Sequence, residues 1–376
     1  MASRVNVKFV VLLAVVLTAA AGGTAFVAYK VVFKTPAELA RRGDAKMAEG
    51  EFRAAELLYS KAVNKDPYNS VYLLKWRDAL EQWVPDTDRE LQTEFASTYR
   101  QLHNQLARSD NLANIDYQLE YLDLLMTWMR DQGFNRSSYE MLAKDADEYI
   151  KYQEPLHPDD PRVAALKRVR GMAWARIGLT GLDLTAEQAE QTREDFEAVL
   201  AADPDDYETM FMQVGLAQAA LAKAQNAGRL TEAGRLTERI EQTLDDFIAA
   251  NGSQSVAGTL GEMMRVQNSL REQVRALMAE HAGAAIPMIQ KLRDEAQEFT
   301  VEAARRMASA PAGEVTTDVI RRLHALESQT NSKNDFAATL PLLKAQLAAH
   351  PDDESLTVLY AEVLSSRQEF AEDGLE

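Results

Sequence analysis

The sequence predicts an all-α chain, and two observations carry that prediction. Gly and Pro, the residues that most often interrupt helices, number only 17 and 11 among 376 residues. Apolar residues recur at steps of three and four over long stretches, which places them on one face of a helix. The chain has no Cys, and this excludes disulfides, Cys-ligated metals and a thiol nucleophile.

Residues 9–29 carry no charged side chain, and as a helix they would extend about 31 Å, enough for the roughly 30 Å hydrocarbon core of a membrane. We therefore expect a short basic tail over residues 1–8 and a transmembrane signal anchor over 9–33. This predicts a single-pass protein of the bacterial inner membrane, with its body outside the cytoplasm. The three alanines at 19–21 also fit a signal-peptidase site, so cleavage is the alternative.

Charge is distributed unevenly along the chain. The first 34 residues hold four of the 41 Lys and Arg and none of the 58 Asp and Glu, so the remainder has a net charge of −21. A body this acidic repels phosphate backbones, which argues against nucleic-acid binding.

Residues 36–69 place small, aromatic and turn-forming residues in a set order. Gly43 and Ala55 are small enough for two antiparallel helices to approach closely, and Pro67 cannot continue a helix. The full set of expected packing and turn residues is Leu39, Gly43, Gly50, Phe52, Ala55, Tyr59, Ala62 and Pro67. This order resembles the tetratricopeptide repeat (TPR), with Arg42 and Lys46 as departures. The resemblance implies an α-solenoid of stacked antiparallel helix pairs.

Weaker matches extend along the chain. Residues 70–252 are interpreted as divergent TPR-like pairs, with helices at 69–83, 88–108, 112–131 and 137–152, and residues 314–376 as TPR-like repeats of which the last is incomplete. The stretches 196–206 and 343–353 agree at seven of 11 positions. The residues expected to pack or end helices here are Trp174, Gly178, Phe196, Pro204, Phe336, Pro351, Ala361 and Phe370.

Residues 253–309 predict a long helical hairpin, with helices at 253–280 and 284–308. Apolar residues follow a 3.5-residue period in the first helix, interrupted by the polar Gln267. Two interpretations remain: an oversized repeat pair within the solenoid, or a protruding hairpin through which the chain self-associates.

The C-terminal end predicts a helix over 352–368 with little chain after it. Its apolar face, formed by Leu356, Leu359, Tyr360, Val363 and Leu364, would then lack a covering helix. We expect this open end to self-associate, and the native protein to continue with further repeats.

No motif indicates catalysis or a cofactor. No two of the five His residues are four positions apart, the Asp-rich turns lack calcium-loop spacing, and no phosphate-binding or nucleophile motif occurs. We therefore expect no metal, no cofactor and no enzymatic activity.

The TPR resemblance implies a groove lined by Ala37, Ala40, Asp44, Met47 and Ala48. Small apolar residues beside an acid suit a helical or basic peptide. The leading hypothesis is a non-catalytic, membrane-tethered scaffold that binds proteins or peptides. The alternatives are the regulatory N-terminal part of a longer envelope enzyme, such as a glycosyltransferase or peptidase, and an envelope chaperone or assembly factor.

Overall fold

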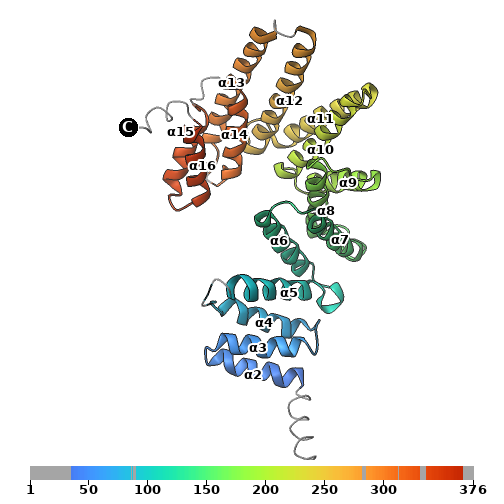
Figure 1. Cartoon of the computed structure of the whole chain (residues 1–376), viewed down its shortest axis with the longest axis vertical. Helices are drawn as coiled ribbons and strands as arrows, with labels where there is room; N and C mark the ends of the chain where they lie inside the picture. The colour runs from blue at the N-terminus through green and yellow to red at the C-terminus, as the bar shows by residue number, and fades with distance from the viewer. Residues whose placement is uncertain are drawn as a thin grey trace, which may run out of the picture. The chain divides into compact units, whose positions relative to one another are not determined.

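The computed structural model describes residues 35–85, 87, 90–281, 285–311, 313–330 and 336–366. In these residues it contains 15 α-helices and no strand, so the prediction of an all-α chain is confirmed (Figure 1). The helices are α2 (Pro36–Ala48), α3 (Phe52–Val63), α4 (Ser70–Gln82), α5 (Ala96–Ala107), α6 (Ile115–Gln132), α7 (Arg136–Gln153), α8 (Pro161–Leu179), α9 (Ala186–Ala202), α10 (Tyr207–Asn226), α11 (Leu230–Asn251), α12 (Val256–His281), α13 (Ile286–Ala308), α14 (Thr317–Thr330), α15 (Thr339–Ala349) and α16 (Glu354–Ser365).

The predicted helix at 88–108 is divided in the structure. A π-helix, Glu90–Phe95, precedes α5. The chain forms two compact units: unit 1 holds Met1–Asn135 and Asp145–Leu166, and unit 2 holds Arg136–Lys144 and Lys167–Glu376.

The membrane prediction requires correction. Among the described helices, none is both long and apolar enough to cross a membrane, and the expected localisation as a single-pass membrane protein is therefore not supported. The segments 1–8 and 9–33, on which that prediction depended, lie outside the described residues.

The first helix pair of unit 1 is built around a glycine. Thr35 caps α2 by accepting a hydrogen bond from the backbone N–H of Glu38 at 3.2 Å, and Gly50 takes a φ of +76° in the turn to α3. Gly43 faces the ring of Tyr59 so closely that a Cβ at Gly43 would overlap it. The two helices can lie this close only because position 43 has no side chain.

A buried carboxylate links α3 to α4. Glu56 is almost fully buried and accepts hydrogen bonds from the indole N–H of Trp76 at 3.0 Å and from Arg53 at 2.7 Å. The guanidinium of Arg53 also lies 4.1 Å from the ring of Trp83. These contacts satisfy the charge of Glu56 away from water and hold α4 in place.

A left-handed turn leads into α6. Asp110, Asn111 and Leu112 all have positive φ, a conformation that costs energy for residues with a side chain. The carbonyl of Leu112 accepts hydrogen bonds from the side-chain amides of Gln118 at 2.8 Å and Gln153 at 2.6 Å, and both glutamines are buried. Amide donors from α6 and α7 therefore hold the end of this turn.

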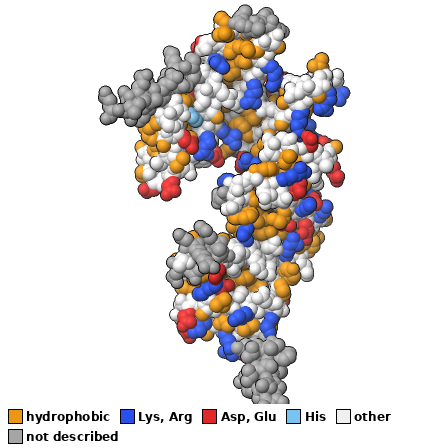
Figure 2. Space-filling model, in the orientation of Figure 1, with side chains coloured by type: hydrophobic (Ala, Val, Ile, Leu, Met, Phe, Trp, Pro, Cys, Tyr) orange, Lys and Arg blue, Asp and Glu red, His pale blue; other side chains and the backbone are white. Residues whose placement is uncertain are grey.

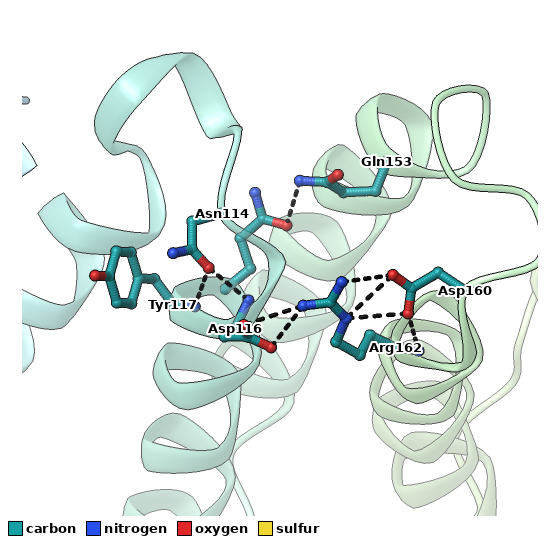
Figure 3. Close-up of polar contacts among 7 residues, drawn as sticks. Asn114, Asp116, Tyr117, Gln153, Asp160 and Arg162 are labelled. Atoms are coloured by element: carbon teal, nitrogen blue, oxygen red, sulfur yellow. Dashed lines mark hydrogen bonds and ion pairs between the residues drawn. The ribbon is translucent and has the colours of Figure 1, made fainter.

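The start of α8 is tied to α6 in the same region. Figure 3 shows the guanidinium of Arg162 between Asp116 and Asp160, with N–O distances of 2.6 to 3.1 Å. The hydrogen bonds from Arg162 hold the pKa of Asp160 at about 2.

Unit 2 repeats the glycine–aromatic contact twice. Gly171 of α8 lies against Phe196 of α9, where a Cβ would come within 2.7 Å of the ring. Gly261 of α12 lies against two residues of α11, where a Cβ would come within 2.9 Å of Ile248 and 3.1 Å of the ring of Phe247.

The predicted hairpin is present as α12 and α13. Val256, Leu260, Met263 and Ala303 are buried in the core of unit 2 at the hairpin base. Near the turn, Met278, Ile286 and Met288 are exposed. The base therefore packs as a repeat pair would, while the far end extends beyond the core.

The C-terminal helix α16 does not keep its apolar face open, contrary to our expectation. Leu356, Leu359 and Val363 are buried in the same core as α14 and α15, and Tyr360 and Leu364 pack against it. The face is covered because α16 packs on both preceding helices. Residues 367–376, including Phe370, lie outside the described residues.

A buried carboxylate also caps the N-terminal end of α15. Glu327 of α14 accepts hydrogen bonds from the backbone N–H groups of Ala338 at 2.8 Å and Thr339 at 2.9 Å, and from the hydroxyl of Thr339 at 2.5 Å. The first N–H groups of a helix have no partner within the helix, so a side chain of α14 supplies one for α15.

We expect Gly43→Ala to lower the free energy of unfolding by about 1–3 kcal/mol, because the added methyl group must displace the buried ring of Tyr59. Gly234→Ala is the control, since a Cβ there meets nothing within 4 Å and alanine favours the helix by about 0.5–1 kcal/mol. Urea unfolding of both variants measures the difference. Equal stabilisation by the two changes would contradict the close contact.

We expect Glu327→Ala to cost roughly 1–3 kcal/mol for each backbone donor that it leaves buried and unpaired. Amide hydrogen exchange at Ala338 and Thr339 should accelerate, with a smaller effect elsewhere. Glu298→Ala, an exposed carboxylate on α13, should change stability by less than about 0.5 kcal/mol. Unchanged exchange at Ala338 and Thr339 would show that Glu327 does not cap α15.

Candidate interaction surfaces

The predicted groove on α2 is not a single open surface. Ala37 and Ala48 are exposed, Met47 is half-buried against the core, and Ala40 is buried within it. Ala40 therefore packs inside unit 1 and does not line a groove. The reason is that α4 lies against α2 as well as α3.

Asp44, the acid expected to attract a basic ligand, already has two partners. The hydroxyl of Tyr59 donates to it at 2.8 Å and the ammonium of Lys75 at 2.6 Å. Burial raises the pKa of Asp44, but the hydrogen bonds from Lys75 and Tyr59 outweigh that effect and the pKa lies below its ordinary value. Lys75 thus supplies within the chain the positive charge that we expected from a ligand.

A surface longer than the predicted groove on α2 lies in unit 2 between α9 and α11, and residues of α10 form its floor. One pocket of about 320 Å³ runs from the end of α8 between these helices, and a second of about 570 Å³ continues to the ends of α9 and α11. Both are lined by Gln213, Arg239 and Thr243, so together they form one surface, which we call the α9–α11 groove.

The α9–α11 groove is apolar inside and ion-paired at its rim. Its apolar lining comprises Leu184, Phe196, Leu200, Val214, Leu216, Ala217, Ala220, Leu236, Ile240 and Phe247. At the rim, Arg193 and Arg239 both contact Glu197, at 2.6 and 3.8 Å, and Lys223 pairs with Asp183 at 2.7 Å. The sequence analysis did not predict this groove. The available signal was the set of alanines at 217, 219 and 220 of α10, because their small side chains leave space between α9 and α11.

A third pocket of about 600 Å³ lies between α10, α11 and α12 and is more polar. Gln218 of α10 donates to the side-chain oxygen of Asn268 on α12, and Arg265 of α12 pairs with Asp245 of α11 at 3.1 Å. These contacts join its walls, so the polar groups in this pocket serve mainly to hold three helices together.

The predicted packing residues have different surroundings. Leu39, Gly43, Ala55, Tyr59, Ala62, Trp174, Gly178, Phe196 and Phe336 are buried; Phe52 is half-buried; Gly50, Pro67, Pro204, Pro351 and Ala361 are exposed. The glycine that faces Phe196 is Gly171, two turns before Gly178, which instead lies against Leu216. Exposed Ala361 has no packing role, because α16 buries Leu359 and Val363 on another face.

No described residues form a group of three His, Asp or Glu that could hold a metal ion. His103 is buried between α4, α5 and α6, and neither of its ring nitrogens has a hydrogen-bond partner among the described residues. Burial, followed by the charge of Arg77, lowers the pKa of His103 to about 4. The absence of metal, cofactor and catalysis stays a prediction.

The comparisons with known proteins give little. No family model and no curated protein matches the sequence. Solved structures that are similar to the chain include the Assembly Chaperone of RpL4 (Acl4), residues 1–338, at 10% identity, with 91% of this chain and 100% of that one covered and a TM-score of 0.37.

We expect the His103 ring to stay neutral as the pH falls from 7 to 5. The unfolded chain would bind a proton near pH 6.5 while the folded chain would not, so folding stability should fall with pH below 6.5 by about 1.4 kcal/mol for each unit that separates the two pKa values. NMR titration of the His103 ring measures the folded value. A pKa near 6.5 would contradict the burial of a ring that has no hydrogen bond in the described chain and only the carboxylate of Glu120, 4.0 Å from Nδ1, as a nearby acid.

Proposed function

We propose that this protein is a non-catalytic scaffold for protein interaction, built as a TPR-like α-solenoid, and that the α9–α11 groove holds a helical segment of a partner. The α9–α11 groove, whose two pockets are mainly apolar and meet at Gln213, Arg239 and Thr243, is the observation that carries this proposal.

The helix pairs support the repeat interpretation. In α2–α3 and α8–α9, a glycine on the first helix faces an aromatic ring on the second, as the small and large positions of a repeat require. A helix pair of this kind has to stack on its neighbours to bury its apolar face, and stacked pairs leave extended grooves between helices.

The groove has the dimensions and chemistry for a helix. The 17 residues of α9 extend about 25 Å, which matches roughly five turns of a helix lying alongside. An amphipathic helix would place its apolar face against the half-buried Ala217, Ala220 and Leu236, while its polar face remained in solvent. The rim charges are paired within the chain, so apolar contact would supply most of the affinity.

The buried polar groups serve the fold. Three buried carboxylates each accept hydrogen bonds from neighbouring backbone or side-chain donors; they belong to Glu56, Glu327 and Asp195. They are not gathered around one open cleft, as an active site would require. None of these observations favours the hypotheses of a regulatory segment of an enzyme or of an envelope assembly factor.

Site-specific crosslinking tests the groove. We expect a photoreactive amino acid in place of Ala217, on the groove floor, to yield discrete crosslinked proteins in the cells that make this chain. The same replacement at Ala276, an exposed position of α12 outside the groove, should not yield them.

A second substitution provides the control within the groove. Leu236→Glu would place a charge on the apolar wall and should abolish crosslinking from position 217 without changing the melting temperature by more than a few degrees. Equal crosslinking from positions 217 and 276, or crosslinking at 217 that survives Leu236→Glu, would contradict the proposal.

A further inference from the structure

An arginine of unit 2 is stacked on aromatic rings and has no ion pair among the residues that the structure describes. The guanidinium of Arg322 on α14 lies 3.8 Å from the ring of Phe211 and 5.7 Å from that of Tyr207, both on α10. Its Nε is buried and has no hydrogen-bond partner among the described residues. Stacking holds the guanidinium in one plane and leaves its outer N–H groups available to a carboxylate.

The nearest carboxylates are already engaged elsewhere. Asp318 pairs with Arg321 at 3.0 Å, and Glu208 pairs with Arg168 at 2.7 Å. Burial is the main cause that lowers the pKa of Arg322, and the negative charges of Asp318 and Glu208 offset it only in part.

A second basic pocket lies beside the C-terminal end of α14. It measures about 330 Å³ and is lined by Arg271 of α12 and Arg293 of α13, together with Gln267, the polar residue that interrupts the apolar period of α12. No Asp or Glu is among its described lining residues, and neither arginine has an ion pair within the described chain.

The two basic positions lie along one helix. Gln329 lines the second pocket and follows Arg322 by seven residues, which places it on the same face of α14 about 10 Å further along. Figure 2 shows Lys and Arg side chains gathered over α12, α13 and α14 on the visible face. Three or four residues of extended chain would span this distance.

The chain does not lack acids that could have paired these arginines, since it has 58 Asp and Glu against 41 Lys and Arg. We propose that unit 2 binds an acidic segment of a partner protein along α14, with one carboxylate at Arg322 and another at Arg271 and Arg293. This inference rests on the proposed function as a scaffold and names the chemistry of a partner. It differs from our sequence-based expectation of a basic partner.

A protein segment fits better than a nucleic acid. A nucleic acid presents phosphates continuously, and binding it takes many basic contacts along its backbone. Here the basic groups form two separate positions on a chain whose net charge is −17. Two spaced carboxylates need only those two positions, and each can be held by paired N–H groups of an arginine.

Fluorescence anisotropy on the full chain tests this proposal with three probes. They are a labelled peptide of alternating Glu and Ser, the same peptide with Gln in place of Glu, and a single-stranded oligonucleotide. We expect the acidic peptide to bind at least about tenfold more tightly than the Gln peptide, because paired charges are lost in the latter.

Single substitutions test which arginines bind the acidic peptide. Arg271→Gln and Arg293→Gln, both at exposed positions, should each weaken binding of the acidic peptide about two- to fivefold, and Arg322→Gln about tenfold. Arg305→Gln, at an exposed position of α13 where the arginine pairs with Glu302 at 3.6 Å, should have little effect. Leu236→Glu in the α9–α11 groove should leave this binding unchanged, which separates the two sites.

Three results would overturn the inference: equal binding of the acidic and Gln peptides, wild-type affinity in both Arg271→Gln and Arg293→Gln, or tighter binding of the oligonucleotide than of the acidic peptide. The exposed variants keep the test decisive even if Arg322→Gln disturbs folding. Loss of crosslinking in the α9–α11 groove with intact peptide binding would count against the proposed groove alone.

Discussion

The fold depends on glycines that allow an aromatic ring on one helix to reach the backbone of its neighbour. The contact occurs between Gly43 and Tyr59, between Gly171 and Phe196, and, more loosely, between Gly261 and Phe247. Protein interiors are close-packed, so each ring fixes the separation and the rotation of its helix pair. Phe196 and Phe247 also line the α9–α11 groove. The contacts that space the helices therefore set the walls of the proposed binding surface.

Buried polar side chains are a second constraint on how the helices are arranged. A buried amide or carboxylate costs free energy unless it finds a partner, so each one admits few arrangements of the helices around it. Glu56 joins α3 to α4, the Arg170–Asp195 pair joins α8 to α9 at 2.7 Å, and Gln153 holds the left-handed turn before α6. Apolar packing alone would allow helices to slide past one another, whereas these contacts define their positions.

Local signals in the sequence predicted much of the fold, and long-range contacts were the part it could not predict. The turn at Gly50, which the sequence analysis expected, depends on residues within a few positions of each other. The role of Asp44 depends on Lys75, 31 residues away, and the spacing rule selected Gly178 where the structure uses Gly171. Both glycines lie on one face of α8 two turns apart, so periodicity could not separate them. The grooves were missed because they form between helices whose separation no local pattern records.

The cap of α15 by Glu327 gives the C-terminal region a direction of assembly. A ribosome makes α14 before α15, so the carboxylate that satisfies the first N–H groups of α15 is in place when those groups emerge. The residue that caps α15, Glu327 of α14, is therefore already present when α15 forms, and α16 then packs against both helices. A circular permutant opened between α14 and α15 would reverse that order of synthesis, and its α15 would have to wait uncapped until the end of translation.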